Sequence, residues 1–522
     1  MGSENNLSGP QNRFLRKVYI MKKKILAMLL LSSMLISVFA SCSEGGENTE
    51  ETSAAAVNTP AAEEVVEEAE EEITLESAAA QYADRDYGGY EYRVADRGDP
   101  GTYADWQTFD VYAAELTGEV INDAVYERNT LLEETMNIKI VECPFTHGAV
   151  TSSVKTSIMA SADDYDVFTD GLANIAPLVS QNYILDLRQI ETLKFENPWW
   201  DQMIYEDLSI FNKSFFMTGD ISVMDNYGTW CYLFNKTMIS DFGLESPYEL
   251  VDSGKWTLDK HNEMAQATTV DLDGDGKWTM ADSYGYITEG YNSTAMWNCF
   301  GYRIISKDAD GTPYYSYSGE EQLTALQRVI ETQYAPFTNM GSNSTVTGGG
   351  GLTENTRENQ FAIGRALFYY AGLRNITLYR DSDTDFGIIP APKYTEEQSQ
   401  YYSSYSNGNC TAYSIPVTSG DPVKVGDITE AMAHLSVYSL TPAYYDKTLI
   451  GKSTRDQESE PMLELILATR NYDLGVIFGW GNIAGSIHGM KDPNTVASTL
   501  QKSEKAATKI LNRAIEDLLV IQ

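Results

Sequence analysis

Oxygen-bearing side chains recur between residues 271 and 282 at the spacing of a metal-binding loop. The segment reads DLDGDGKWTMAD, and the side chains at loop positions 1, 3, 5, 9 and 12 are Asp271, Asp273, Asp275, Thr279 and Asp282, with the Lys277 carbonyl at position 7. Calcium is a hard cation that takes about six to eight oxygen ligands, and Gly276 allows the sharp turn at position 6. The pattern predicts one structural Ca²⁺ site, with Asp282 in place of the usual glutamate. A solvated Asp-Gly turn is the alternative.

The remaining residues of chemical interest do not form a catalytic or zinc-binding motif. Five cysteines (42, 143, 231, 299 and 410) and four histidines (147, 261, 434 and 488) are scattered, without a Cys-x-x-Cys pair. No GxSxG, HExxH or P-loop pattern occurs. We therefore expect a protein that is not an enzyme. A surface glycoside hydrolase stays open, because 75 acidic residues make chance pairs of carboxylates certain.

Charge and aromatic content indicate the class of ligand. The formal net charge is −38, which repels nucleic acid and anionic membrane surfaces and suits an uncharged or cationic ligand. The chain also has 34 tyrosines and 8 tryptophans. Flat amphipathic rings of this kind stack on sugars, although most of them fill ordinary cores.

The N-terminal region has the pattern of an export signal. Lys22, Lys23 and Lys24 precede an apolar run from Ile25 to Phe39, which is too short for a confident membrane-spanning helix. Ala40 and Ser41 then lead to Cys42, as in a lipobox, where the cysteine carries lipid after cleavage. Residues 1–20 are interpreted as an upstream extension and 21–42 as a lipoprotein signal peptide. A plain signal peptide or an anchor helix is the alternative. The prediction places the mature protein on the outer face of a bacterial cell membrane.

An acidic segment follows the lipobox. Between Ser43 and Ala80 there are twelve glutamates and no lysine or arginine. Like charges repel and little can be buried, so residues 43–86 are predicted to form a disordered tether.

From residue 87 onward, predicted strands alternate with predicted helices. Strands are expected at 90–95, 138–142, 165–169, 230–235, 365–370 and 385–389. Helices are expected within 118–137, near 150–160, and at 257–267 and 495–519, with Thr257 as an N-cap. This alternation is typical of an α/β fold with parallel strands. Ligands of such folds bind beyond the carboxyl ends of the strands.

Several segments in this order resemble the extracellular solute-binding proteins of ABC transporters, in the family of the maltose- and oligosaccharide-binding proteins. They are ERNTLLEETMNIKI, YDVFTDGLANIAPLVSQNYILDL, NPWWD, GDISVMDNYGTWCYLFNK, SPYELVDSGKWTLDK, DLDGDGKWTMADSYGY and RDQESEPMLELILATRNYDLG. The resemblance implies a two-lobed periplasmic-binding-protein-like α/β fold with discontinuous lobes joined by a hinge. It places lobe 1 at 87–195 and 360–418, and lobe 2 at 196–359 and 419–522.

The resemblance also implies a function and a site. The expected function is capture of a solute, such as a sugar or oligosaccharide, for delivery to an ABC permease in the membrane, by a lipid-anchored monomer that binds no nucleic acid. A peptide- or polyamine-binding protein of the same fold and a purely structural surface protein are alternatives. Strand ends and aromatic character select the candidate ligand-binding residues Asp96, Arg97, Asp170, Tyr370 and Arg374 in lobe 1 and Asp225, Trp230, Trp297 and Trp480 in lobe 2. Trp230 and Trp297 could instead belong to the core, and Arg374 could cap a following helix.

Overall fold

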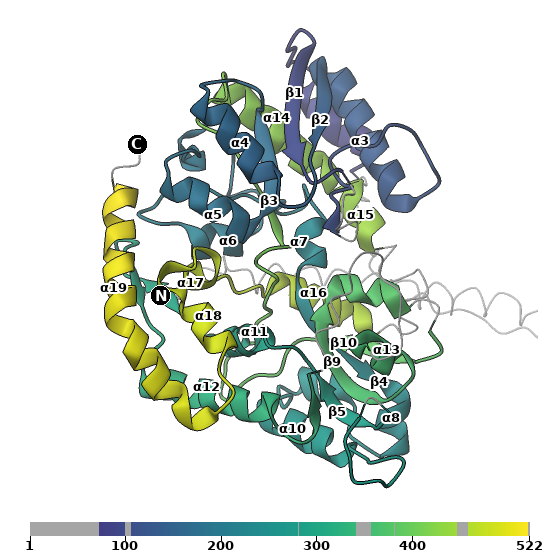
Figure 1. Ribbon diagram of the computed structural model, residues 1–522. Coiled ribbons are helices and arrows are strands. Elements are labelled where there is room, and N and C mark those ends of the chain that lie inside the picture. The colour runs from purple at the N-terminus through teal and green to yellow at the C-terminus, as the bar shows by residue number, and fades with distance from the viewer. Residues whose placement is uncertain are drawn as a thin grey trace, which may run out of the picture. The chain divides into compact units, whose positions relative to one another are not determined.

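The computed structural model describes residues 73–99, 106–279, 281–340, 356–379, 382–445 and 458–519. Within these ranges, two mixed β-sheets with helices packed around them carry the fold (Figure 1). The predicted α/β class with two sheets is confirmed. The predicted signal peptide, Cys42 and the tether up to residue 72 lie outside the described residues.

The first sheet has the strand order β11-β3-β1-β2. Its strands are β1 (Tyr90–Asp96), β2 (Ile138–Pro144), β3 (Val167–Gly171) and β11 (Thr411–Ser414). Strand β1 is parallel to β2 and β3, and β11 is antiparallel to β3. The third strand begins and ends two residues later than predicted, because its pairing with β11 extends through Gly171.

Helices between the parallel strands make the crossovers that this pairing requires. They are α3 (Val120–Met136) and α4 (Val150–Met159), and α5 (Leu172–Ser180) follows β3. The predicted helical spacing in α3 is confirmed, since Ile121, Val125 and Leu132 are buried on one face. The helix ends where Asn137 adopts a left-handed conformation with φ of 49°.

The second sheet has the order β10-β4-β9-β5-β8. Its strands are β4 (Trp230–Asn235), β5 (Tyr284–Ile287), β8 (Thr338–Asn339), β9 (Ala366–Gly372) and β10 (Phe386–Ile389). The lobe boundaries differ here from the expected ones. The segment 360–418 was expected in lobe 1, but β9 and β10 pair with β4 on either side of it, so only the part around β11 joins the first sheet.

The helices of the second lobe are α8 (Lys236–Asp241), α9 (Pro247–Asp252), α10 (Leu258–Ala267), α11 (Asn292–Cys299), α12 (Glu320–Gln333), α13 (Arg357–Ala362) and α16 (Ser459–Ala468). The predicted cap of α10 is confirmed, because the Thr257 hydroxyl accepts a hydrogen bond from the Lys260 amide at 3.3 Å. The short strands β6 (Ile305–Lys307) and β7 (Pro313–Tyr315) form a separate pair.

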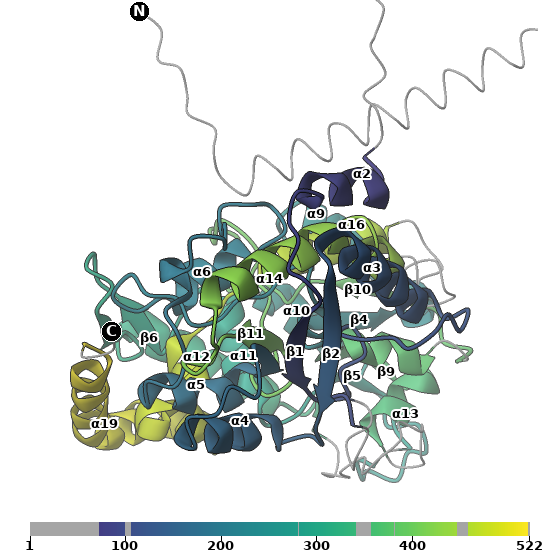
Figure 2. The same ribbon diagram turned by 90° about the horizontal axis from the view of Figure 1, so that it is seen from above.

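Two segments expected elsewhere pack on the first lobe. Helix α14 (Pro422–Ser436), expected in lobe 2, contacts α3. Helix α2 (Leu75–Ala79), expected in the tether, lies against α14 and α3 (Figure 2). Ala78, Ala79 and Tyr82 are buried there, and the Tyr82 hydroxyl hydrogen bonds with His434 Nδ1 at 3.0 Å. The prediction of disorder was wrong for 73–86, because apolar side chains after the glutamate run complete this core.

Two connections between the sheets run side by side. The segment 214–230, which includes α7 (Met224–Tyr227), and the segment 403–414 are bridged antiparallel at Met217 with Tyr413 and at Thr229 with Tyr405. No side chain fits between them at Gly228, where a Cβ would lie 2.7 Å from the Cys410 Cα. The two segments therefore form one tightly packed ribbon.

The chain ends with α17 (Leu474–Ile477), α18 (Ile483–His488) and the long helix α19 (Val496–Leu519), at the yellow end of Figure 1. The predicted amphipathic tail is confirmed, since Leu500, Leu511 and Leu518 are buried while most intervening residues are exposed. Among the described residues, no helix is long and apolar enough to cross a membrane.

Candidate functional site

A cavity of about 430 Å³ opens beside the ribbon. This is within the size range of small-molecule sites. Its walls come from Trp106, Gly228, Trp230, Glu289, Tyr291, Asn292, Thr294, Ala295, Asn298, Glu358, Tyr369, Ala371, Gly372, Asn375, 404–409, Val476 and His488. These segments belong to the β4 and β9 ends of the second sheet, to α11 and to the connection that leads into β11 of the first sheet.

Aromatic rings form a large part of the wall. Trp106, Trp230, Tyr291 and Tyr369 all line the cavity. Trp230 is partly buried, and its ring packs on the fully buried Tyr370 with 5.3 Å between centroids. Tyr291 contacts the His488 ring edge-on at 5.4 Å. Burial lowers the pKa of His488, so its ring is neutral at pH 7. The aromatic wall thus presents apolar faces without a positive charge.

The segment 404–409, with the sequence Ser-Tyr-Ser-Asn-Gly-Asn, supplies a polar wall. The Ser406 amide donates to the Gly228 carbonyl at 2.8 Å, which ties the segment to the ribbon. The Asn407 amide group donates to the Val476 carbonyl at 3.2 Å. This wall is therefore fixed from both sides before any solute enters.

Helix α11 adds two asparagines with constrained amides. Asn292 Nδ2 donates to Thr288 Oγ1 at 2.9 Å, which directs its Oδ1 atom elsewhere. Within the described part of the chain, that buried Oδ1 has no hydrogen-bond partner. Asn298 Nδ2 donates to the Tyr302 carbonyl at 2.8 Å. A buried acceptor without a partner is costly.

Two carboxylates lie at one end of the cavity and share an arginine. Arg357 lies 3.0 Å from Glu289 Oε2 and 3.9 Å from Glu358 Oε1. The Tyr369 hydroxyl donates to Glu358 Oε1 at 2.9 Å. Two negative charges against one positive charge leave this end acidic.

Three predicted site residues, Asp96, Arg97 and Asp170, lie at the strand ends but beneath the cavity wall. All three are fully buried, and Arg97 Nε lies 3.5 Å from Asp170 Oδ1. The Arg97 guanidinium donates to the carbonyls of Gly408 and Asn409, each at 3.4 Å. These residues therefore position the polar wall and do not line the cavity.

Four further predicted residues are packed in the interior. Trp297 is 0% exposed and donates from Nε1 to the Gln322 carbonyl at 3.0 Å. Tyr370 stacks on Tyr232, and Trp480 stacks on Phe478. Asp225 pairs with the buried Arg470 at 2.8 Å. Burial raises the pKa of Asp225 to about 6, and Arg470 opposes that rise.

Trp230 and Arg374 are the predicted residues that reach a cavity. Trp230 lines the cavity described above, and Arg374 lines a neighbouring one of about 590 Å³. The Arg374 guanidinium lies over the Trp106 ring, 5.0 Å from its centroid.

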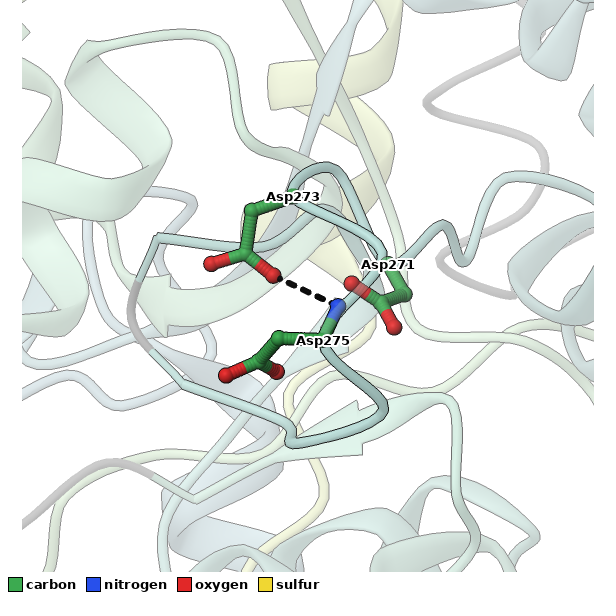
Figure 3. Close-up of side chains that lie close together, drawn as sticks. All are labelled: Asp271, Asp273 and Asp275. Atoms are coloured by element: carbon green, nitrogen blue, oxygen red, sulfur yellow. Dashed lines mark hydrogen bonds between the residues drawn. The ribbon is translucent and has the colours of Figure 1, made fainter.

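The Asp271–Asp282 segment folds into a closed loop. Val270 and Ser283 are bridged antiparallel at its ends, and Gly274 and Gly276 have φ of 71° and 76°. Oxygen atoms of Asp271, Asp273 and Asp275 lie within 4.8 Å of one another (Figure 3).

Asp282 occupies a different position in this loop. Its carboxylate accepts from the Leu272 and Thr279 amides at 3.1 and 2.7 Å, and the hydrogen bond from Thr279 is the main cause of its lowered pKa. Asp271 also accepts from the Gly274 and Gly276 amides, at 2.7 and 2.9 Å. The three aspartates fit a hard cation, and Asp282 holds the loop closed.

Several lining residues were not predicted, namely Trp106, Glu289, Tyr291, Asn292, Asn298, Glu358, Tyr369 and the segment 404–409. The run SSYSNGN was the available signal, since small polar residues with Asn-Gly directly before a strand mark a loop at a sheet edge.

The four cysteines within the described ranges are free thiols.

Comparisons with known proteins give the fold a name. No family model and no curated protein matches the sequence. Solved structures do match. The cyclic α-maltosyl-1,6-maltose-binding protein from Arthrobacter globiformis has 14% identity and a TM-score of 0.53, over 82% of this chain and 100% of that one. A cyclo/maltodextrin-binding protein complexed with maltotetraose has 12% identity and a TM-score of 0.51, over 82% and 97%. An ABC transporter solute-binding protein from Thermotoga lettingae, bound with α-D-tagatose, has 14% identity and a TM-score of 0.50, over 81% and 100%. The chain has the two-lobed fold of ABC solute-binding proteins, as predicted.

Proposed function

We propose that this protein captures a sugar or oligosaccharide outside the cell and delivers it to an ABC importer, without chemical change. The fold is shared with proteins described as binding maltodextrins and tagatose. The observation that carries the proposal is the cavity beside the ribbon, which combines aromatic faces with fixed amides. Trp106 and Trp230 would cover the apolar faces of sugar rings, while the 404–409 wall and Asn292 would pair with hydroxyls.

The test is a stability screen with recovery of the ligand. Neutral mono- and oligosaccharides, peptides and polyamines are each added to the full-length protein, and thermal unfolding is recorded. A sugar that binds the native state should stabilise it by RT ln(1 + [L]/Kd), about 2.7 kcal/mol at a hundredfold excess over Kd. Chromatography should then recover the sugar intact. Stabilisation by peptides or polyamines alone would contradict the proposal, and cleavage of a glycan would replace it with a hydrolase.

We also propose that lipid on Cys42 anchors the protein. The basic, apolar and small-residue segments that precede Cys42 support this. Mass spectrometry of the mature protein should find acyl chains on an N-terminal cysteine, and Cys42→Ser should release the protein from the membrane fraction. Cys143→Ser, on β2, is the matched control and should stay membrane-bound. An unmodified N-terminus elsewhere would refute the anchor.

Finally, we propose that the loop 271–282 holds Ca²⁺ in a structural role. The three clustered aspartates of Figure 3 support it, and the Lys277 carbonyl and Thr279 are the further ligands that the spacing provides. Chelation should lower the melting temperature, and Ca²⁺ rather than Mg²⁺ should restore it. Asp271→Asn should remove that response, while Asp492→Asn, an exposed turn residue, should keep it. A melting temperature that ignores the chelator would identify a plain turn.

A further inference from the structure

The acidic end of the cavity has a defined composition. Among the described residues that line the cavity, Glu289 and Glu358 are the only Asp, Glu, Lys or Arg side chains. Glu289 lies between β5 and α11, and Glu358 lies in the first turn of α13. Two elements that are distant in sequence thus bring two carboxylates to one wall.

The surroundings of this pair hold both carboxylates in place without neutralising them. Arg357 is mostly buried and bridges them, with 3.0 Å to Glu289 Oε2 and 3.9 Å to Glu358 Oε1. Its Nη1 atom also donates to the Thr288 carbonyl at 3.3 Å. Tyr369 donates to Glu358 Oε1 at 2.9 Å. These contacts use Oε2 of Glu289 and Oε1 of Glu358. Within the described residues, no hydrogen bond occupies the second oxygen of either carboxylate, so that oxygen can accept from a solute.

The net charge of this cluster is negative. Two carboxylates oppose one guanidinium, and His488, the lining imidazole, is neutral because burial lowers its pKa. The Arg374 guanidinium lies over the Trp106 ring, 5.0 Å from its centroid, and lines the neighbouring cavity. An anionic group placed beside Glu289 and Glu358 would lose its hydration and meet like charge, which binding sites use to reject wrong partners. A hydroxyl or a protonated amine would instead donate to the second carboxylate oxygens.

We propose that Glu289 and Glu358 act as a charge filter that admits neutral and amine-bearing sugars and rejects sugar acids. This inference rests on the proposed sugar-binding function. It names the determinant of specificity and the class of solute that the site excludes.

The experiment measures binding of the full-length protein to three sets of soluble oligosaccharides of matched length. They are neutral glucose and galactose oligomers, chitosan oligomers with a free amine, and oligogalacturonates. Titration calorimetry should detect binding of the neutral or amino oligomers. The affinity for oligogalacturonate should be at least about tenfold weaker, which is the scale of one like-charge contact. Higher salt should narrow this difference, because screening weakens repulsion.

Two variants test the residues themselves. Glu289→Gln leaves one carboxylate, Glu358, opposite Arg357, so the net charge of this cluster becomes zero. The affinity for oligogalacturonate should then come within about threefold of the affinity for the neutral oligomer. Glu358→Gln should do the same if loss of the Tyr369 contact is tolerated. Glu516→Gln, exposed on α19, is the matched control and should keep the wild-type selectivity.

The outcomes separate the two proposals. Equal wild-type binding of neutral oligomers and oligogalacturonates overturns the filter and leaves sugar capture intact. Selectivity that survives in both folded glutamine variants assigns the discrimination to other residues and also overturns the filter. Failure of every oligosaccharide to bind refutes the proposed function, and the filter with it.

Discussion

Replacement of Trp230 tests whether the cavity is the binding site. Trp230 begins β4, lines the cavity with part of its indole and packs with the rest on Tyr370. A tryptophan can bury up to about 250 Å². Because Trp230 is partly exposed, a solute could cover on the order of 50 Å² of its ring. At about 25 cal/mol per Å², covering this area contributes about 1.3 kcal/mol. Trp230→Ala should therefore weaken sugar binding about tenfold.

The control is a tryptophan of the core. Trp297 lies in α11, as do four residues of the cavity wall, but it is fully buried, and its indole donates to the Gln322 carbonyl. Trp297→Ala should cost about 3–5 kcal/mol of stability, as large-to-small changes in cores do. Trp297→Phe keeps most of the volume and should lower the melting temperature while leaving the affinity within about twofold, since the ring is outside the cavity.

Titration calorimetry with the sugar that gives the largest thermal shift measures both effects, and circular dichroism checks the fold of each variant. The reasoning is refuted if folded Trp230→Ala binds with wild-type affinity. It is equally refuted if Trp297→Phe weakens binding as much as Trp230→Ala does, because the binding surface would then lie elsewhere.

Two further predictions concern the packing and protonation of the scaffold. Gly228→Ala should destabilise the protein by about 1–3 kcal/mol, because its Cβ would lie 2.7 Å from the Cys410 Cα. In urea unfolding, Gly489→Ala, whose Cβ would meet ordinary contacts, should stay near wild type. Burial raises the pKa values of Asp96 and Glu142, and the charge of Glu142 raises that of Asp96 further, while the hydrogen bond with Asp96 opposes the rise at Glu142, so the folded state holds a proton that the unfolded state releases. That stability is present at low pH and is lost as pH rises through the folded pKa values. Between pH 5 and pH 8, the melting temperature of Glu142→Gln should fall less than that of wild type. Parallel profiles would show that the pair does not titrate in this range.

The elements could be predicted because their signals are local. The apolar spacing of Ile121, Val125 and Leu132 depends only on the helical repeat. Thr257 caps α10 by accepting a hydrogen bond from the Lys260 amide, only three residues later. The sheet to which each strand belongs is not local. Strand β9 pairs antiparallel with β4 across more than a hundred residues, and no pattern within 366–372 records that partner. The lobe boundaries therefore could not follow from the sequence.

The tether boundary was missed for a related reason. Residues 75–79 are predicted as solvated by their acidic surroundings, yet their alanines are buried against α14, which lies more than three hundred residues later. Arg85 and Tyr87 then both reach Asp427 of α14. The composition of a short segment predicts disorder only when no distant surface completes its core.

The candidate site shows how the strand-end rule was correct in location and incomplete in detail. Asp96, Arg97 and Asp170 do lie at the edge where ligands bind in α/β folds. The chain passes over that edge once more, in the segment 404–409, before β11 joins the sheet. Arg97 is then covered, and its guanidinium holds the carbonyls of Gly408 and Asn409.

The charged residues Arg97 and Asp170, at the ends of β1 and β3, thus lie beneath the segment 404–409 that lines the cavity. Gly171, where a Cβ would lie 2.1 Å from the Gly408 carbonyl oxygen, allows the covering segment to approach so closely. Because Arg97 is buried and paired with Asp170, its charge acts on the orientation of the 404–409 backbone rather than on a solute. The surface that a sugar would meet is consequently made of amides and rings, and its net charge is set at the opposite end by Glu289, Glu358 and Arg357. Arg97 and Asp170 position the 404–409 wall, whereas Glu289 and Glu358 are the residues proposed to select the solute. A change at Glu289 or Glu358 could therefore alter the ligand preference without disturbing that wall.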